Sequence, residues 1–77
     1  MPGRVYNRFR ILLAEKQTEE NRNISYDEVK EKTGVAKSTI SAWATNKVKR
    51  YDAGTIKEFC DFLNCDVGDL IVYQRER

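Results

Sequence analysis

The sequence predicts an all-α fold, in which five short helices enclose one compact core. Apolar residues recur at spacings of three and four along most of the chain, which is the pattern of amphipathic helices. Serine and aspartate residues stand before several of these segments, where they are suited to cap a helix. A chain of 77 residues with 40% apolar content can bury one small core. We therefore expect residues 1–77 to form a single domain.

A first helix is predicted over residues 4–16 and a flexible loop over residues 17–23. The loop segment, QTEENRN, is polar and shows no period, so we expect it to connect two helices without structure of its own. In the predicted helix, several apolar side chains and the aliphatic stem of a lysine lie on one stripe of the helix surface. The members of this stripe are Val5, Phe9, Leu12, Leu13 and Lys16.

A second helix is predicted to begin after Ser25 and to end at Gly34. Ser25 and Glu28 have the spacing of a capping box, in which each side chain bonds the other residue's backbone N–H. Ile24 and Val29 flank the same boundary as a hydrophobic staple. Gly34 suits a tight exit, because a residue without a Cβ enters the left-handed conformation at little cost.

A third helix follows directly, with Ile40 and Trp43 on its inward face. Ala36 stands at its N-cap position without a side-chain oxygen, which forgoes about 1 kcal/mol of capping. Ser38 is the alternative cap, and it would start the helix two residues later. Trp43 also has two interpretations, as a core residue or as a ring that stacks on a nucleic-acid base. The outward residues are Lys37, Ser38, Ser41, Ala42 and Thr45.

The fourth and fifth helices are predicted to begin after Asp52 and Asp66, with Asn64 as a left-handed exit between them. Residues 73–77 form a short charged tail. The apolar end at residues 71–73 has two interpretations that the sequence leaves open. It either completes the core or forms half of a two-fold interface.

The two central helices and the glycine between them resemble the helix-turn-helix of the Cro and phage-repressor (XRE-like) family. Two residues depart from that family's pattern: Lys30, where a small residue is usual, and Ala36, where serine or threonine is usual. The resemblance implies a lambda-repressor-like DNA-binding domain with its motif over residues 25–46. The residues that carry it are Val29, Gly34, Val35, Ile40 and Trp43, followed by the run Thr55–Ile71.

This resemblance also implies how the chain would meet double-stranded DNA, with the helix of residues 37–45 in the major groove. Ordinary solvated surface is the alternative for each implied contact. Family members generally act as homodimers on two-fold sites, so a homodimer is implied as well. The residues expected to read bases are Lys37, Ser38, Ser41 and Ala42. The residues expected to hold phosphates are Ser25, Tyr26, Thr45, Asn46, Lys47, Lys49 and Arg50.

Charge is unevenly distributed along the chain, although the formal net charge is only +2. Residues 1–16 carry +3 and residues 36–50 carry +4, whereas residues 51–72 carry −4. This pattern predicts a cationic face and an anionic back, as nucleic-acid binders of this size require.

Other classes of function have little support in the sequence. The chain has no histidine, and its two cysteines, Cys60 and Cys65, are expected to be reduced structural thiols, so neither a metal nor a cofactor is predicted. No catalytic constellation or phosphate-binding loop is recognisable, so we expect no enzymatic activity and no small-molecule ligand. No apolar run marks a signal peptide or membrane span, so a cytoplasmic location is expected.

Two functions remain after these exclusions. The first is a sequence-specific DNA-binding transcriptional regulator, and in the manner of the family a repressor. The alternative is a protein-interaction module, either antitoxin-like or a regulatory adaptor, that uses the same helical scaffold.

Overall fold

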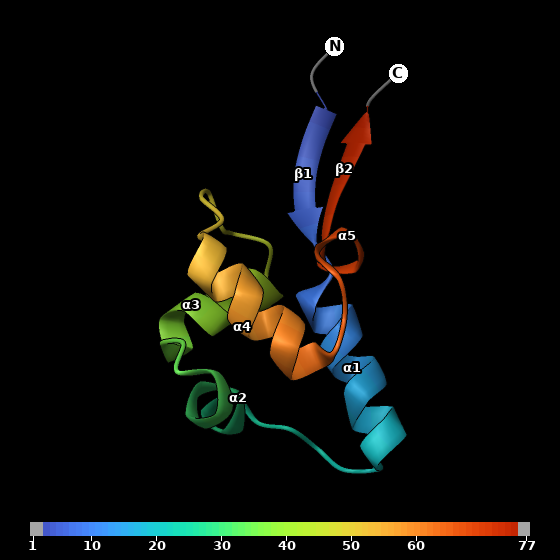
Figure 1. Ribbon diagram of the computed structural model, residues 1–77, viewed down its shortest axis with the longest axis vertical. Coiled ribbons are helices and arrows are strands. Elements are labelled where there is room, and N and C mark those ends of the chain that lie inside the picture. The colour runs from blue at the N-terminus through green and yellow to red at the C-terminus, as the bar shows by residue number, and fades with distance from the viewer. Residues whose placement is uncertain (1–2, 76–77) are drawn as a thin grey trace.

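Residues 3–75, the part of the chain described by the computed structural model, form five helices and two strands. The helices form the body of the molecule, and a two-stranded ribbon extends from one end of it (Figure 1). With the ribbon included, the molecule is 41 Å along its longest axis. The elements in chain order are β1 (Gly3–Asn7), α1 (Phe9–Glu20), α2 (Tyr26–Thr33), α3 (Lys37–Ala44), α4 (Ala53–Leu63), α5 (Val67–Leu70) and β2 (Ile71–Arg75).

The two-stranded sheet corrects the prediction of an all-α fold. β1 and β2 pair antiparallel, with Gly3 opposite Arg75 and Asn7 opposite Ile71. The first helix therefore begins at Phe9 and not near residue 4, because the Asn7 side-chain oxygen accepts a hydrogen bond from the Phe9 N–H at 2.9 Å. Of the predicted tail over residues 73–77, residues 73–75 belong to β2, and residues 76–77 lie outside the described part of the chain.

The predicted flexible loop over residues 17–23 is also partly wrong, since α1 continues to Glu20 and ends at Asn21 with φ 53°. The Lys16 ammonium and the Glu20 carboxylate form an ion pair of 2.7 Å along the helix surface. The Gln17 side-chain oxygen accepts from the Ile24 N–H at 2.7 Å and so ties the connection to the helix end. The ion pair and the hydrogen bond of these polar side chains hold α1 together beyond its apolar stripe, and the spacing of apolar residues does not reveal such interactions.

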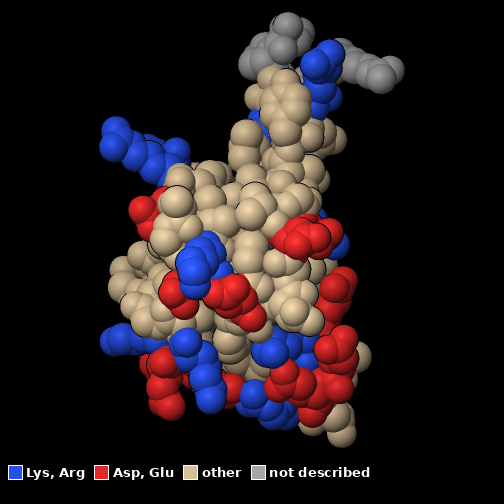
Figure 2. Space-filling view, viewed as in Figure 1, with Lys and Arg blue, Asp and Glu red and all other residues tan. Residues whose placement is uncertain are grey.

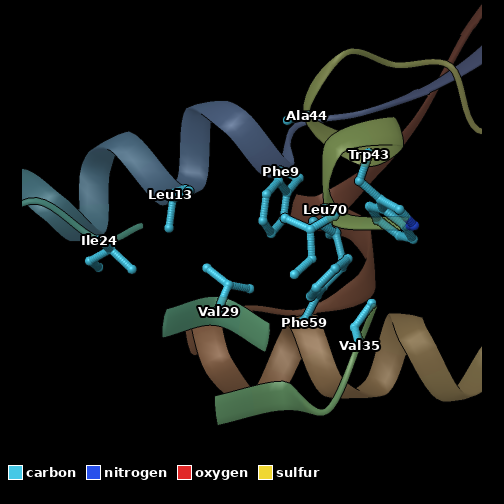
Figure 3. Packing of buried hydrophobic residues seen from close by; sticks show 10 residues of the cluster. Phe9, Leu13, Ile24, Val29, Val35, Trp43, Ala44, Phe59 and Leu70 are labelled. Carbon is cyan, nitrogen blue, oxygen red and sulfur yellow. The ribbon is translucent and has the colours of Figure 1, made fainter. Parts of the chain in front are cut away.

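The core is centred on three aromatic rings from three helices, which Figure 3 shows together with their aliphatic neighbours. The Phe59 ring centroid lies 4.6 Å from that of Phe9 and 4.8 Å from that of Trp43. Trp43 is 1% exposed, which confirms its interpretation as a core residue. Leu70 of α5 and Val29 of α2 are completely buried against this cluster. Burying each such side chain stabilises the fold by about 1.5–3 kcal/mol.

The helix-turn-helix has the predicted boundaries. The Ser25 hydroxyl accepts from the Glu28 N–H at 3.2 Å, and Gly34 ends α2 with φ 76°. α3 begins at Lys37 after Ala36, which has an extended backbone and makes no side-chain cap, so the alternative start near Ser38 is wrong. The Glu28 carboxylate departs from the predicted capping box and instead accepts from both terminal nitrogens of Arg22, at 2.8 and 2.6 Å.

The fourth helix begins and ends, and the fifth helix begins, where the capping residues predict. The Asp52 carboxylate accepts from the Thr55 N–H at 3.0 Å, and Asn64 leaves α4 with φ 53°. Asp66 and Asp69 form a capping box at the start of α5. Cys60 and Cys65 are both free and half-buried at the junction of these helices. Burial beside Cys60 raises the pKa of the Cys65 thiol to about 11.

Candidate nucleic-acid interface

The outer face of α3 presents the side chains predicted to read bases. Lys37, Ser38 and Ser41 are exposed, while Ala42 is half-buried. The opposite face is held by Ile40 and by its partners in the core. α3 is therefore fixed by its apolar side and leaves a polar side free along its length.

A hollow of about 510 Å³ lies between this outer face and the loop that joins α3 to α4. It brings two of the predicted base-reading residues beside three of the predicted phosphate-binding residues. The residues that line it are Ser38, Thr39, Ala42, Trp43, Lys47, Val48, Lys49, Arg50, Asp52 and Thr55. Lys37 and Ser41 are not among these lining residues, so they lie on the helix face beyond the hollow.

Three basic side chains of the connecting loop, Lys47, Lys49 and Arg50, are exposed. Figure 2 shows basic side chains extending from the body on the side of this loop, with acidic atoms next to them. The one carboxylate in the hollow, that of Asp52, accepts hydrogen bonds from the Thr55 N–H and hydroxyl. Its charge is thus directed at the N-terminus of α4, where a helix favours an anion.

Lys37, the basic residue at the start of α3, has an acidic partner within the protein. Its ammonium lies 3.0 Å from a carboxylate oxygen of Asp27 in the first turn of α2. Both side chains are more than half exposed, at 55% and 75%, so the pair is worth at most about 1 kcal/mol. Lys37 can therefore leave Asp27 for another hydrogen-bond acceptor at a small cost in free energy.

The two predicted phosphate contacts on α2 differ in accessibility. Ser25 is exposed, and its oxygen already accepts the Glu28 N–H, which leaves the hydroxyl hydrogen free to donate. Tyr26 is half-buried and packs against the core, so only part of its side chain reaches the surface.

Thr45 and Asn46, also predicted to hold phosphates, have partners inside the protein. The Thr45 hydroxyl donates to the Ser41 carbonyl at 2.9 Å. The Asn46 side chain accepts from the Asn7 N–H at 2.8 Å and donates to the Asn7 carbonyl at 3.1 Å. Asn46 is exposed, but both functions of its amide are used within the fold.

Thr39 and Thr55 line the hollow and were not among the predicted site residues. Thr39 lies one helical turn before Ala42 on the same side of α3, so its spacing could have indicated this position. Thr55 reaches the hollow because α4 begins beside the loop, a tertiary relation that no local pattern in the sequence reveals.

The family model of the Cro/C1-type helix-turn-helix DNA-binding domain matches residues 16–76, a span that begins within α1 and includes all of α2 to β2. The chain belongs to the Cro/C1-type helix-turn-helix family. This match confirms the resemblance to the Cro and phage-repressor family, and the matched residues include α2 and α3.

A solved structure is similar to this Cro/C1-type domain over most of its length. It is the crystal structure of a candidate DNA-binding protein from Bacteroides fragilis, with 30% sequence identity and a TM-score of 0.70. The match covers 90% of this chain and 100% of that one. No curated protein matches the sequence.

The described residues contain neither a membrane-spanning helix nor a cluster of metal-binding side chains. Within residues 3–75, no helix has the length and apolar character needed to cross a membrane. In the same residues, no three side chains of the histidine, cysteine or acidic types converge in a way that could hold a metal ion.

Proposed function

We propose that this Cro/C1-type domain is a sequence-specific transcriptional regulator that represses by occupying its operator. In this proposal α3 enters the major groove, with Lys37, Ser38, Ser41 and Ala42 toward the base edges. The observation that carries the proposal is the hollow beside α3, where readout residues and the basic loop face the same side.

The basic loop would supply the sequence-independent part of the affinity. Lys47, Lys49 and Arg50 are exposed beside the α3 face, so they are placed to hold phosphates as the helix enters the groove. Ser25 would add a hydroxyl donor from the start of α2. Thr45 and Asn46 would hold a phosphate only by exchanging existing bonds, since their side chains serve the fold and their backbone N–H groups donate to the Ser41 and Trp43 carbonyls.

We propose further that the domain binds as a homodimer to two half-sites and acts in the cytoplasm. Two copies of α3 would then enter successive major grooves on one side of the duplex, which requires half-sites about 10 base pairs apart. Repression follows by simple obstruction, because a bound dimer excludes other proteins from the same face of the DNA.

Selection from a random duplex pool tests this proposal directly. We expect enrichment of a two-fold motif, and a log–log slope of affinity against salt of about −4 to −5 per subunit if four to six phosphates are neutralised. Reversing charge at Lys47 and Lys49 should abolish binding. The matched control reverses Lys32 and Lys57, which are exposed outside the hollow. An absence of enrichment would favour a protein-interaction module.

A further inference from the structure

The two cysteines of the chain lie close together where α4 ends. Cys60 is in the last turn of α4, and Cys65 follows the helix just before α5. Both are half-buried and pack against the core. Neither lines the hollow beside α3, so any chemistry of these thiols is separate from the proposed DNA contacts.

The turn that ends α4 fastens the backbone of Cys65 to that of Cys60. Asn64 adopts the left-handed conformation, and its N–H donates to the Cys60 carbonyl. The Cys65 N–H donates to the same carbonyl at 3.0 Å. This second bond is that of a Schellman motif, in which the side chains at its two ends commonly make an apolar contact. Here both side chains are thiols, so the turn brings two sulfur atoms together.

The backbone geometry permits a disulfide between these two residues. A disulfide requires Cα atoms within about 7 Å of each other. The 3.0 Å hydrogen bond between the Cys65 nitrogen and the Cys60 oxygen meets this requirement, because the covalent bonds on either side add less than about 4 Å. The electrostatics of the pair agree with this proximity. After burial itself, the neighbouring Cys60 thiol contributes most to raising the pKa of the Cys65 thiol.

A groove of about 430 Å³ gives small solutes access to Cys65. It lies between α1 and the end of α4, and Cys65 lines it together with Leu63 and Lys16. Cys60 is not among its lining residues. A small soluble reagent in this groove therefore reaches the Cys65 sulfur first.

We propose that Cys60 and Cys65 are a redox-modification site, at which a low-molecular-weight disulfide converts the two thiols into an internal disulfide. The Cys65 thiolate attacks one sulfur of the reagent, which forms a mixed disulfide and releases one small thiolate that takes up a proton. Cys60 then loses its proton and attacks the Cys65 sulfur, which releases the second small thiol. The two protein thiols are thus oxidised, and the reagent is reduced to two thiols.

The first step of this exchange is slow, because only the thiolate attacks and burial raises the pKa of the Cys65 thiol to about 11. The position of equilibrium is therefore a better test of the site than the rate. In a reducing compartment both thiols stay reduced, and the disulfide forms only when small disulfides accumulate.

The internal disulfide closes a ring over residues 60–65 and joins α4 to the residue that precedes the Asp66 cap of α5. The folded turn already holds the two thiols together, whereas in the unfolded chain they must be brought together by chance. The disulfide thus restricts the unfolded chain more than the folded protein. Oxidation should therefore make the domain harder to unfold.

Equilibration with buffers of reduced and oxidised glutathione tests the site, with mass spectrometry of acid-quenched samples to separate the products. For the folded wild type we expect the internal disulfide, with an effective concentration of the two thiols about 10-fold or more above that of the same chain in concentrated urea. The unfolding equilibrium constant of the oxidised protein should be lower by the same factor. The proposal is overturned if the effective concentration is no higher in the folded protein, or if the folded protein stops at a mixed disulfide with glutathione.

Two substitutions of Asn64 separate the effect of the turn from that of proximity in sequence. Asn64→Gly keeps the left-handed conformation and should retain the effective concentration of the wild type. Asn64→Val strains that conformation, because a β-branched residue rarely adopts it, and should lower the effective concentration toward the value in urea. Circular dichroism verifies that each variant is folded. Equal values in folded Asn64→Gly and Asn64→Val would contradict the role of the turn.

A third variant tests the path of the reagent. In Cys60→Ala the groove and Cys65 remain, so the reaction with oxidised glutathione should stop at a mixed disulfide on Cys65. If folded Cys60→Ala forms no mixed disulfide at equilibrium, attack from the groove is excluded.

Discussion

Asn46 and Asn7 are joined by two hydrogen bonds that link the end of α3 to the base of the ribbon. The Asn46 side-chain amide bonds both backbone groups of Asn7, at 2.8 and 3.1 Å, as a neighbouring strand would. The Asn7 side chain in turn accepts from the Phe9 N–H and starts α1. These contacts connect α3, β1 and α1 through a few polar groups, so the orientation of α3 depends on them.

Replacing Asn46 with glycine should destabilise the protein by about 1–3 kcal/mol, because two backbone groups of Asn7 lose their partners. Glycine is the informative substitution, since Asn46 has φ 57° and glycine keeps that conformation without strain. Urea unfolding measures the change. The control is Asn21→Gly at the end of α1, which also has a positive φ and should shift stability by less than about 0.5 kcal/mol. Equal effects from both variants would mean that the amide bonds contribute nothing.

Removing the Asp27 carboxylate should strengthen DNA binding. In Asp27→Ala, Lys37 no longer has a competing acceptor at 3.0 Å and one repulsive charge near the duplex is lost. We expect a gain of about 2- to 5-fold in affinity, as an exposed pair of this kind is worth up to about 1 kcal/mol. Fluorescence anisotropy with the selected operator measures it. Asp61→Ala makes the same charge change at the Lys57 pair on α4, and no gain is expected there.

Acid should weaken the connection between α1 and α2. The Arg22 guanidinium lowers the pKa of the Glu28 carboxyl below its ordinary value near 4.5. A carboxyl with a lowered pKa stabilises the fold above its unfolded pKa, and that contribution is lost as pH falls through the folded value. The melting temperature of the wild type should therefore drop between pH 5 and pH 3 by more than that of Glu28→Gln. Parallel curves would show that this pair does not contribute.

The Cys65 thiol should react slowly with iodoacetamide at pH 8. Its pKa of about 11 lowers the thiolate population roughly 100-fold relative to a thiol with the ordinary pKa of 9.0. A more basic thiolate is also a stronger nucleophile, and this recovers only about 10-fold of the lost rate. We expect a net rate about 10-fold below that of a small unburied thiol. Mass spectrometry locates the modified residue. A rate equal to that of the small thiol would contradict the burial of Cys65.

The parts of the fold predicted from sequence are those that depend on neighbouring residues. Ser25, Gly34, Asp52 and Asn64 mark helix boundaries through their own chemistry, and the structure places these boundaries as expected. The ribbon was missed because Val5 also fits the apolar stripe of α1. Its true partner, Tyr73, lies near the other end of the chain, and no local pattern connects the two.

The candidate site was predictable to a similar extent. The helix spacing correctly placed Lys37, Ser38 and Ser41 on the exposed face of α3. The partners of Lys37 and Asn46 were not predictable, because Asp27 and Asn7 reach them only after the helices have packed. Roles in binding DNA remain predictions for all of these residues.

The ribbon has a consequence for how the chain folds. Residues 3–7 pair with residues 71–75, so forming the ribbon closes a loop of nearly the whole chain, whereas the helix-turn-helix is built from contacts close in sequence. Local contacts form first and distant pairings follow, since loop closure carries an entropic cost. A partly synthesised or partly folded chain can thus form α2 and α3 before the two strands of the ribbon have paired. Pairing of β1 with β2 is then restricted to chains whose last residues have been made and brought back to the first.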